Sequence, residues 1–171
     1  MAPRNSGGDS KVPPPPVAAP PSVAFPPEAS APPAYWTTSL CGCFDNPSNC
    51  LITCFCPCVT FGQNAEIIDK GSTSCAFAGA LCCLMFHFFC CSYCYTCTYR
   101  TKLRKLYSIP GSQCGDCCLH HWCGPCALSQ EYRELQNRGF NPSIGWVANA
   151  ERRTRQVGVM VPPLVPGSMN R

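Results

Sequence analysis

The stretch CLITCFCPC, from Cys50 to Cys58, places four cysteines and one proline in nine residues of otherwise apolar chain. Thiolates are soft ligands that bind zinc, cadmium or monovalent copper, and a metal or positive charge nearby favours their deprotonated form. Pro57 lacks a backbone donor and disfavours helical geometry at Cys56, so a helix through this stretch is predicted to break there. The predicted metal ligands of this stretch are Cys50, Cys54, Cys56 and Cys58.

Two other interpretations of these cysteines stay open. Cysteine is a small apolar residue that packs well between membrane helices, and cysteines beside a membrane are also sites of acylation. Gln63 and Glu66 follow within two helical turns and are candidate polar neighbours of the metal. The predicted motif therefore consists of Leu51, Pro57, Gln63 and Glu66.

A second cluster, CGDCCLHHWCGPC at residues 114–126, echoes the first. In both clusters, two cysteines six positions apart are followed by Pro-Cys and then by Gln and Glu. Neighbouring Cys-x-x-Cys pairs are typical of a compact zinc site, and no βαβ pattern surrounds them to indicate a redox motif. A structural zinc and a transport or sensing site both fit this pattern. The predicted ligands are Cys114, Cys117, Cys118, His120, His121, Cys123 and Cys126.

Two apolar runs, at about 46–65 and 72–99, are predicted to place these cysteines in a membrane. Residues 71–99 contain no Asp, Glu, Lys or Arg, and about 20 such residues in a helix span a bilayer. Tyrosines end this run as an interfacial belt would, and four basic residues at 100–105 predict a cytosolic end. A buried core helix is the alternative for this run.

The first run contains Pro47, Asn49, Pro57 and Gln63 and is the weaker of the two. If it also crosses, the runs form a helical hairpin with a short turn around residues 69–71. If it does not, it is a re-entrant or interfacial segment. The sequence therefore predicts a cell-membrane protein, multi-pass or single-pass, with membrane lipids as partners.

One face of the longer run collects cysteines at helical spacing. The sharper interpretation is a ladder of soft ligands along a continuous helix. The plainer one, which we favour, is a seam of small residues that packs against another helix or another copy of the chain. The members of this predicted ladder are Cys83, His87, Cys90, Cys94 and Cys97.

Composition divides the 171 residues into three parts. The chain is 46% hydrophobic and 13% charged, its 18 cysteines all lie within 41–126, and 11 of its 19 prolines lie in the first 33 residues. Residues 1–34 are predicted to be a disordered Pro-rich arm, residues 35–150 a cysteine-rich membrane domain, and residues 151–171 a basic flexible tail. An exposed helix is predicted at 128–138, with Gly139 as its stop.

These observations predict a mainly α, small cysteine-rich membrane protein: a helical hairpin with a cysteine-rich loop and disordered termini. No nucleophile, base and orienting group can be assembled, and no phosphate-binding glycine loop is present, so an enzyme is not predicted. The net charge of +4 does not favour nucleic acid as a partner. Zinc or another soft divalent cation is the expected cofactor or cargo, with no organic cofactor, and too few polar groups for a pore predict a homo-oligomer.

The order WTTSLCGCFDN, CLITCFCPC, VTFGQNAEIIDKG and QCGDCCLHHWCGPCALSQEYREL resembles the plant cadmium resistance and cell number regulator proteins, of the cysteine-rich placenta-specific-eight domain family. The resemblance covers roughly residues 36–151. It implies a plasma-membrane protein of heavy-metal transport or resistance, with Cys56 and Cys58 as metal residues. A non-transporting regulator or scaffold that controls cell number and organ size is the alternative. Asn49 stands where many relatives have a cysteine, and the ladder is not part of the family pattern.

Overall fold

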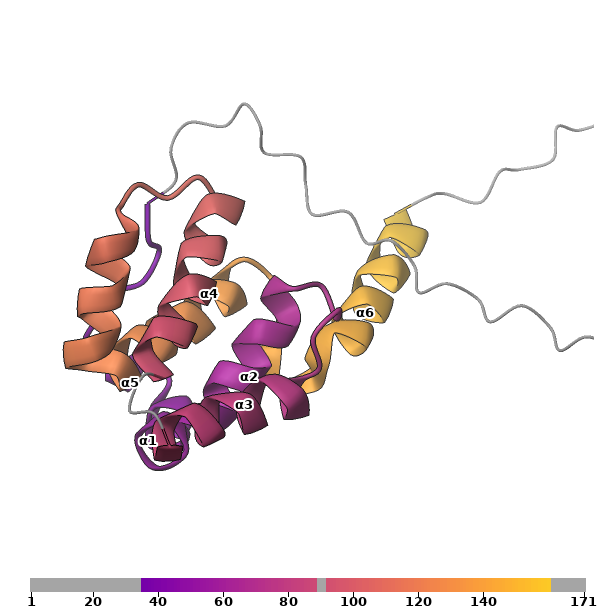
Figure 1. Ribbon diagram of the computed structural model, residues 1–171. Helices are drawn as coiled ribbons and strands as arrows, with labels where there is room; N and C mark the ends of the chain where they lie inside the picture. Colours follow the sequence, from indigo (N-terminus) through magenta and orange to yellow (C-terminus); the bar gives the residue numbers. More distant parts are fainter. Residues whose placement is uncertain (1–34, 89–91, 161–171) are drawn as a thin grey trace, which may run out of the picture.

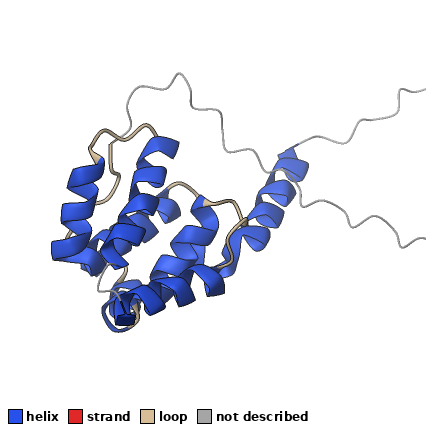
Figure 2. Ribbon diagram, viewed as in Figure 1, coloured by secondary structure: helices blue, strands red, loops and turns tan. Residues whose placement is uncertain are grey.

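The computed structural model describes residues 35–88 and 92–160, and the predicted arm at 1–34 lies outside them. The described residues form helices and connecting turns (Figures 1 and 2). The elements in chain order are η1 (Cys43–Asp45), α1 (Pro47–Phe55), α2 (Pro57–Ile68), α3 (Cys75–Phe88), α4 (Ser92–Leu106), α5 (Gln113–Asn137), η2 (Pro142–Ile144) and α6 (Gly145–Met160). The mainly α class predicted from the sequence is confirmed.

Local sequence accounts for most of the helix ends. The Asn46 side chain accepts a hydrogen bond from the Asn49 amide, and Pro47 occupies the first position of α1, where no donor is needed. After each of the helices α2, α4 and α5, a backbone amide donates a hydrogen bond to the carbonyl five residues earlier. The residue before this amide has positive φ in each case: Gly139 (φ 83°) after α5, Lys70 (φ 54°) after α2 and Ser108 (φ 52°) after α4. Gly139 is the stop predicted for α5.

Helices α2 and α3 form an antiparallel hairpin, closed by the turn that was predicted around residues 69–71. The two backbones approach closely at two glycines. A Cβ added to Gly62 would lie 2.4 Å from the carbonyl oxygen of Cys75, and one added to Gly79 would lie 2.9 Å from that of Cys58. The hairpin therefore depends on the absence of side chains at these two positions.

The apolar core lies where α2, α4 and α5 meet. Phe61 is fully buried, and its ring centroid is 5.1 Å from those of both Tyr95 and Tyr99. These tyrosines were predicted to form an interfacial belt, but they pack inside the protein, and the Tyr99 hydroxyl donates to Asp69 at 2.8 Å. The tyrosines pack against the core because the hairpin brings Phe61 against α4.

Charged side chains fill the contact between α4 and α5. Arg104 Nε lies 2.9 Å from an Asp116 oxygen, and Arg100 Nη1 lies 3.3 Å from the carboxylate of Glu131, which is fully buried. Trp36 covers the Arg100 guanidinium at 4.1 Å. The basic cluster predicted to flank a membrane span is thus partly internal, because α5 supplies acids that the linear sequence does not place beside it.

The helix predicted to be exposed at 128–138 is also internal. It forms the second half of α5, and most of its first turns are buried. Glu134 accepts hydrogen bonds from the amide and hydroxyl of Thr37, and Gln130 donates to the Thr38 carbonyl. The segment before α1 supplies these partners, which explains why a polar helix can be buried. Helix α6 continues to Met160, so residues 151–160 of the predicted flexible tail are helical; residues 161–171 lie outside the described part of the chain.

The run predicted as a single span at 72–99 contains two described helices, α3 and α4, and residues 89–91 between them lie outside the described part of the chain. Within the described ranges no individual helix has both the length and the apolar composition needed to cross a bilayer. Helices α1 and α2 have this length and composition only when they are taken together, and the pair is bent by 114°.

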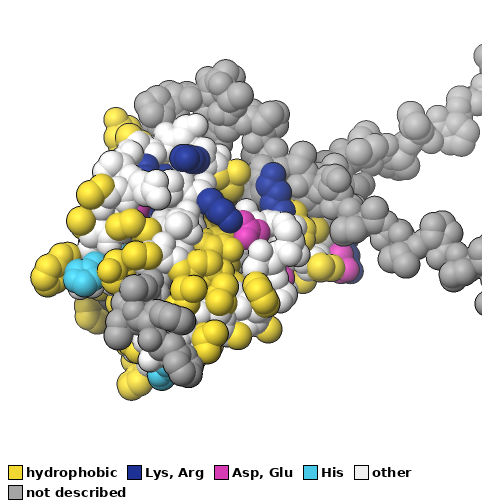
Figure 3. All heavy atoms as spheres, in the orientation of Figure 1, with side chains coloured by type: hydrophobic (Ala, Val, Ile, Leu, Met, Phe, Trp, Pro, Cys, Tyr) yellow, Lys and Arg dark blue, Asp and Glu magenta, His cyan; other side chains and the backbone are white. Residues whose placement is uncertain are grey.

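Large apolar side chains are exposed on α1, on α3 and at one position of α5. Figure 3 shows hydrophobic side chains gathered over the part of the surface where Figure 1 places α2 and α3. Phe55 is 82% exposed and Trp122 is 81% exposed, and Phe77 is more than half exposed. We call the exposed set Leu51, Phe55, Phe77, Phe86 and Trp122 the apolar face.

Candidate metal-binding site

The bend between α1 and α2 positions the Cys-Pro-Cys stretch. Cys56 has φ −136° and ψ 67°, which ends α1, and Pro57 begins α2. The Cys56 amide still donates to the Ile52 carbonyl at 2.7 Å, whereas Pro57 has no donor with which to continue the ladder. The break predicted at this proline is therefore present, with an angle of 114° between the two helices.

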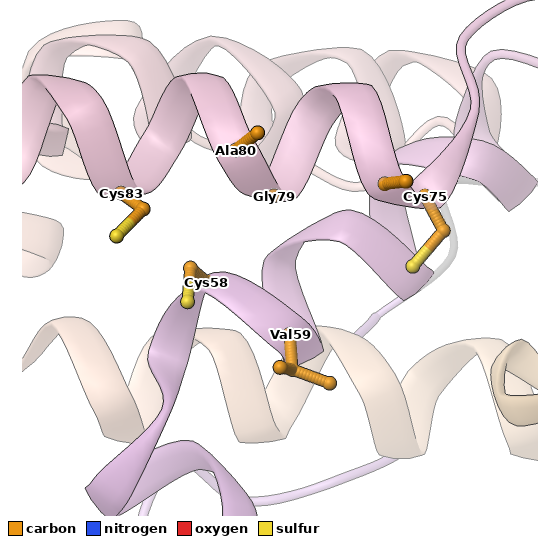
Figure 4. A pocket seen from close by; sticks show the side chains of 7 residues that line it. Cys58, Val59, Cys75, Gly79, Ala80 and Cys83 are labelled. Carbon is orange, nitrogen blue, oxygen red and sulfur yellow. The ribbon is translucent and has the colours of Figure 1, made fainter.

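Beside the bend, a pocket of about 270 Å³ lies between α2 and α3. Three cysteines line it, namely Cys58 on α2 and Cys75 and Cys83 on α3, and the rest of its lining is small or apolar. Figure 4 shows Cys58 and Cys83 at the same end of the gap between α2 and α3, with Cys75 at the other end. The approach of the backbones at Gly79 brings α3 close enough for Cys83 to oppose Cys58.

The other cysteines of the first stretch point outward. Cys54 and Cys56 are exposed, Cys50 is half-buried, and Leu51 of the motif is exposed as well. The bend therefore leaves Cys56 accessible on the surface and turns Cys58 toward α3.

Glu66, predicted as a polar neighbour of the metal, has a structural position instead. One carboxylate oxygen accepts from the Cys75 amide at 3.1 Å and the other accepts from the Trp146 amide at 2.8 Å. These amides begin α3 and α6, where helices have donors without partners. Glu66 thus caps two helices, while Gln63 is half-buried on the same helix, α2.

The second cluster, predicted to form a loop, lies in helix α5, which also bends. Cys123 has φ −137° and ψ 45°, close to the values at Cys56. Pro125 follows two residues later and Pro57 follows one residue later. The internal echo seen in the sequence therefore has a counterpart in the backbone: each copy contains a helix that breaks at a cysteine just before a proline.

Within α5 the predicted ligands contact different neighbours. Cys114 and Cys118 are exposed and hydrogen-bonded to each other, and this neighbouring thiol raises the pKa of Cys118. His120 is buried, and its Nε2 lies 3.0 Å from Glu131. His121 is exposed, with its ring 4.9 Å from that of Tyr93. Cys123 is exposed and Cys126 is half-buried. The two histidines therefore do not join the thiols.

Among the described residues, no three Cys, His, Asp or Glu side chains come together in a group that could hold a metal ion. The metal ligands predicted from the sequence thus stay a prediction for the single chain. What the structure brings together are pairs and looser sets of thiols, the set at Cys58, Cys75 and Cys83 among them.

The predicted ladder does not form one helical face. Cys83 and His87 lie on α3, Cys94 and Cys97 lie on α4, and Cys90 is outside the described residues. Cys97 is buried against Cys117 of α5, and burial followed by this thiol contact raises its pKa. The seam interpretation suits Cys97, because its neighbour is a packed helix.

The turn after α2 is held by a charged contact. The Asp69 carboxylate accepts from Lys102 and Tyr99, both at 2.8 Å, and from Thr73 at 2.9 Å. Burial by itself raises the pKa of this carboxyl, but the three hydrogen bonds outweigh it and the net pKa is lower than usual. The electrostatics therefore stabilise the turn that keeps α3 beside α2.

Sequence reasoning missed a row of buried polar side chains on the inner side of the bend. Thr53 Oγ1 and Thr60 Oγ1 are 2.8 Å apart across the break, and Asn64 Nδ2 donates to the Leu128 carbonyl. Asn49 is buried in the same row. The four-residue spacing of Asn49 and Thr53 and of Thr60 and Asn64 was the available signal, because it places them on one helical side.

The α-helices of the described residues, with their cysteine-bearing bends and buried ion pairs, define a small cysteine-rich helical protein. The sequence profile of the PLAC8 family matches residues 36–134, and the chain belongs to that family. The matched region begins at Trp36, which covers Arg100, and ends at Glu134, which holds the segment before α1.

Named relatives fall into two groups. Cell number regulator 4 of Zea mays is 55% identical over 114 residues, which cover 64% of this chain and 72% of the relative. Protein PLANT CADMIUM RESISTANCE 2 of Arabidopsis thaliana is 50% identical over 137 residues, 80% of this chain and 90% of the relative. Protein PLANT CADMIUM RESISTANCE 1 of the same plant is also 50% identical over 137 residues. None of these three names is that of an enzyme, and no solved structure matches the chain.

Proposed function

We propose that this protein acts in heavy-metal resistance at the cell membrane, by binding a soft cation such as cadmium or zinc at the Cys-Pro-Cys bend. The observation that carries the proposal is the arrangement at the bend, where Cys56 is exposed and Cys58 is turned toward Cys83. Two relatives named for cadmium resistance, each 50% identical to this chain, also support a function in metal resistance.

In this mechanism Cys56 makes the first contact, because its thiol is exposed at the outer side of the bend. The cation then passes to Cys58, one residue further and directed into the pocket with Cys83 and Cys75. Capture by Cys56 releases its thiol proton to solvent. Each later transfer exchanges one thiolate for another, and the departing thiolate takes up a proton as the incoming thiol gives up its own. The bend is needed because a straight helix would separate Cys56 and Cys58 by about 200° around its axis.

Two thiolates do not complete the coordination of cadmium or zinc, which usually have four ligands. A second copy of the chain, packed through its own bend, would supply the missing thiolates, so the proposal includes a homo-oligomer. The apolar face is formed by side chains of α1, α3 and α5, and lipid is the environment that suits such exposed side chains.

The test is the double variant Cys56→Ser with Cys58→Ser, expressed as the full chain in cadmium-sensitive cells. We expect loss of the tolerance conferred by the wild-type protein, and a lower metal content in the purified variant. Serine is nearly the size of cysteine but is a poor ligand for soft metals, so the fold is preserved. The matched control is Cys41→Ser, since Cys41 is also exposed but lies outside both clusters.

Unchanged tolerance together with unchanged bound metal would reject the metal proposal. A second function, a membrane regulator of cell number, is favoured by the relative named Cell number regulator 4, at 55% identity. The same double variant separates the two functions, because a regulator that binds no metal keeps its effect on cell number when both thiols are removed.

A further inference from the structure

A polar groove lies away from the cysteine site, between the end of α5, η2 and α6. Its volume is about 310 Å³, at the lower end of the range for small-molecule sites. Two arginines, Arg152 and Arg153, line it together with four side-chain amides, and no carboxylate is among its lining residues. The groove is therefore electropositive as well as concave.

Arg153 is held in place before any ligand arrives. Its Cζ lies 3.8 Å from the centroid of the Phe140 ring, and its Nη2 donates to the Arg138 carbonyl at 3.1 Å. Phe140 in turn stacks on Trp146, with ring centroids 6.0 Å apart. An arginine fixed in this way loses little side-chain freedom on binding an anion, which favours affinity.

The amides of the wall hold the shape of the groove. Asn149 Oδ1 accepts from the Asn141 amide at 2.8 Å, and its Nδ2 donates to the Asn141 carbonyl at 2.7 Å and to the Gly145 carbonyl at 2.6 Å. Asn149 is thereby saturated and is buried. Both N–H groups of the Asn149 amide are therefore used, and the charged donors available to a ligand are those of the two arginines.

The third arginine of α6 differs from these two. Arg155 is exposed and lies 3.7 Å from Glu151, whereas neither Arg152 nor Arg153 pairs with an acid among the described residues. A guanidinium has five N–H donors in a planar fork, of which Arg153 uses one within the described part of the protein. Unneutralised guanidinium groups gathered in one groove are typical of anion recognition.

We infer that this groove binds a small ligand with clustered phosphate groups, held by Arg153 and Arg152. Two adjacent forks match a ligand with at least two phosphates better than a single carboxylate, which would engage only one of them. The ring hydroxyls of an inositol phosphate would meet the exposed Gln156 amide. The same chemistry occurs in free inositol phosphates and in phosphoinositide headgroups, and the experiment separates these two sources.

The full-length protein is titrated with inositol trisphosphate in a calorimeter. It is also sedimented with vesicles that contain phosphatidylinositol bisphosphate, or phosphatidylserine at matched surface charge. We expect Arg153→Gln and Arg152→Gln each to weaken binding of the phosphorylated probes by about tenfold, as loss of a charge-assisted contact does. The matched control Arg155→Gln, which removes the same charge from the same helix, should change affinity less than about twofold.

Binding of the soluble probe assigns the groove to a free inositol phosphate, and binding of phosphoinositide vesicles alone assigns it to a lipid headgroup. The inference is overturned if neither probe binds the wild-type protein, or if Arg155→Gln weakens binding as much as the groove variants do. Arg153→Lys, which keeps the charge but loses the fork, should bind with intermediate affinity. Because Arg152 is exposed and unpaired among the described residues, its variant reports on binding even if changes at Arg153 disturb folding.

Discussion

At the scale of single residues, Glu66 holds together parts of the protein that are distant in sequence. Its two carboxylate oxygens accept from the first amides of α3 and α6, which lie 9 and 80 residues away. Gly145 leaves room for this contact, since a Cβ there would lie 2.7 Å from Glu66 Oε1. A residue predicted from the sequence as a polar neighbour of the metal thus has a role in folding.

We expect Glu66→Ala to lower the free energy of unfolding by about 2–3 kcal/mol, because two helix caps of about 1 kcal/mol each are lost together. Denaturant unfolding followed by circular dichroism measures the change. Gln63→Ala is the control, since Gln63 is half-buried in the same helix, and it should change stability by less than about 0.5 kcal/mol. Equal effects of the two variants would contradict the capping role.

At the scale of elements, the hairpin of α2 and α3 rests on the two glycines where the backbones approach. Gly62→Ala is expected to destabilise the protein by about 1–3 kcal/mol, because its methyl group would overlap the Cys75 carbonyl. Thermal unfolding checks this expectation. Ala80→Ser adds one atom to an exposed position of α3 and should cost no more than about 0.5 kcal/mol. A stable Gly62→Ala protein would show that the hairpin can separate without cost.

Element boundaries were predictable where backbone chemistry is local. Pro57 predicted the break, Gly139 predicted the end of α5, and the turn at 69–71 was expected between two apolar runs. Burial was not predictable where the partner is remote in sequence. Glu134 looked solvated in the sequence, but its partner Thr37 is 97 residues away.

The candidate site was predicted in part for the same reason. The Cys-Pro-Cys stretch carries its own bend, so the position of thiols beside a helix break followed from the sequence. The opposition of Cys58 and Cys83 did not, because it depends on how closely α3 packs at Gly79. The histidines of the second cluster were counted as ligands, yet His120 turns toward Glu131, which lies beyond the bend of the same helix, α5, and eleven residues along the chain.

At the scale of the whole molecule, the apolar face contrasts with the charged interior between α4 and α5. We expect the triple variant Phe55→Ser, Phe77→Ser and Trp122→Ser to bind lipid vesicles at least about tenfold more weakly than the wild type, because each aromatic side chain contributes apolar area to the contact. Co-sedimentation with phosphatidylcholine vesicles measures this binding.

Tyr35→Ser is the control for vesicle binding. Tyr35 is 75% exposed, similar to the aromatic residues of the apolar face, but it lies before the first helix. Its replacement should leave the partition coefficient within about twofold of the wild type. If the triple variant and this control sediment alike, the apolar face does not contact lipid.

The ion pairs between α4 and α5 also determine which truncated forms of the protein could fold. Arg100 and Arg104 are buried with acids that all come from α5, at Asp116 and Glu131. A product truncated after α4 would lose these acids together with Leu128 and Leu135 of the apolar core, so the apolar side chains of α2 and α4 that pack against α5 would be exposed to water. Fragments that stop short of α5 should therefore be degraded rather than accumulate, and the cysteine bend at the N-terminal side cannot be studied as an isolated peptide with its native surroundings.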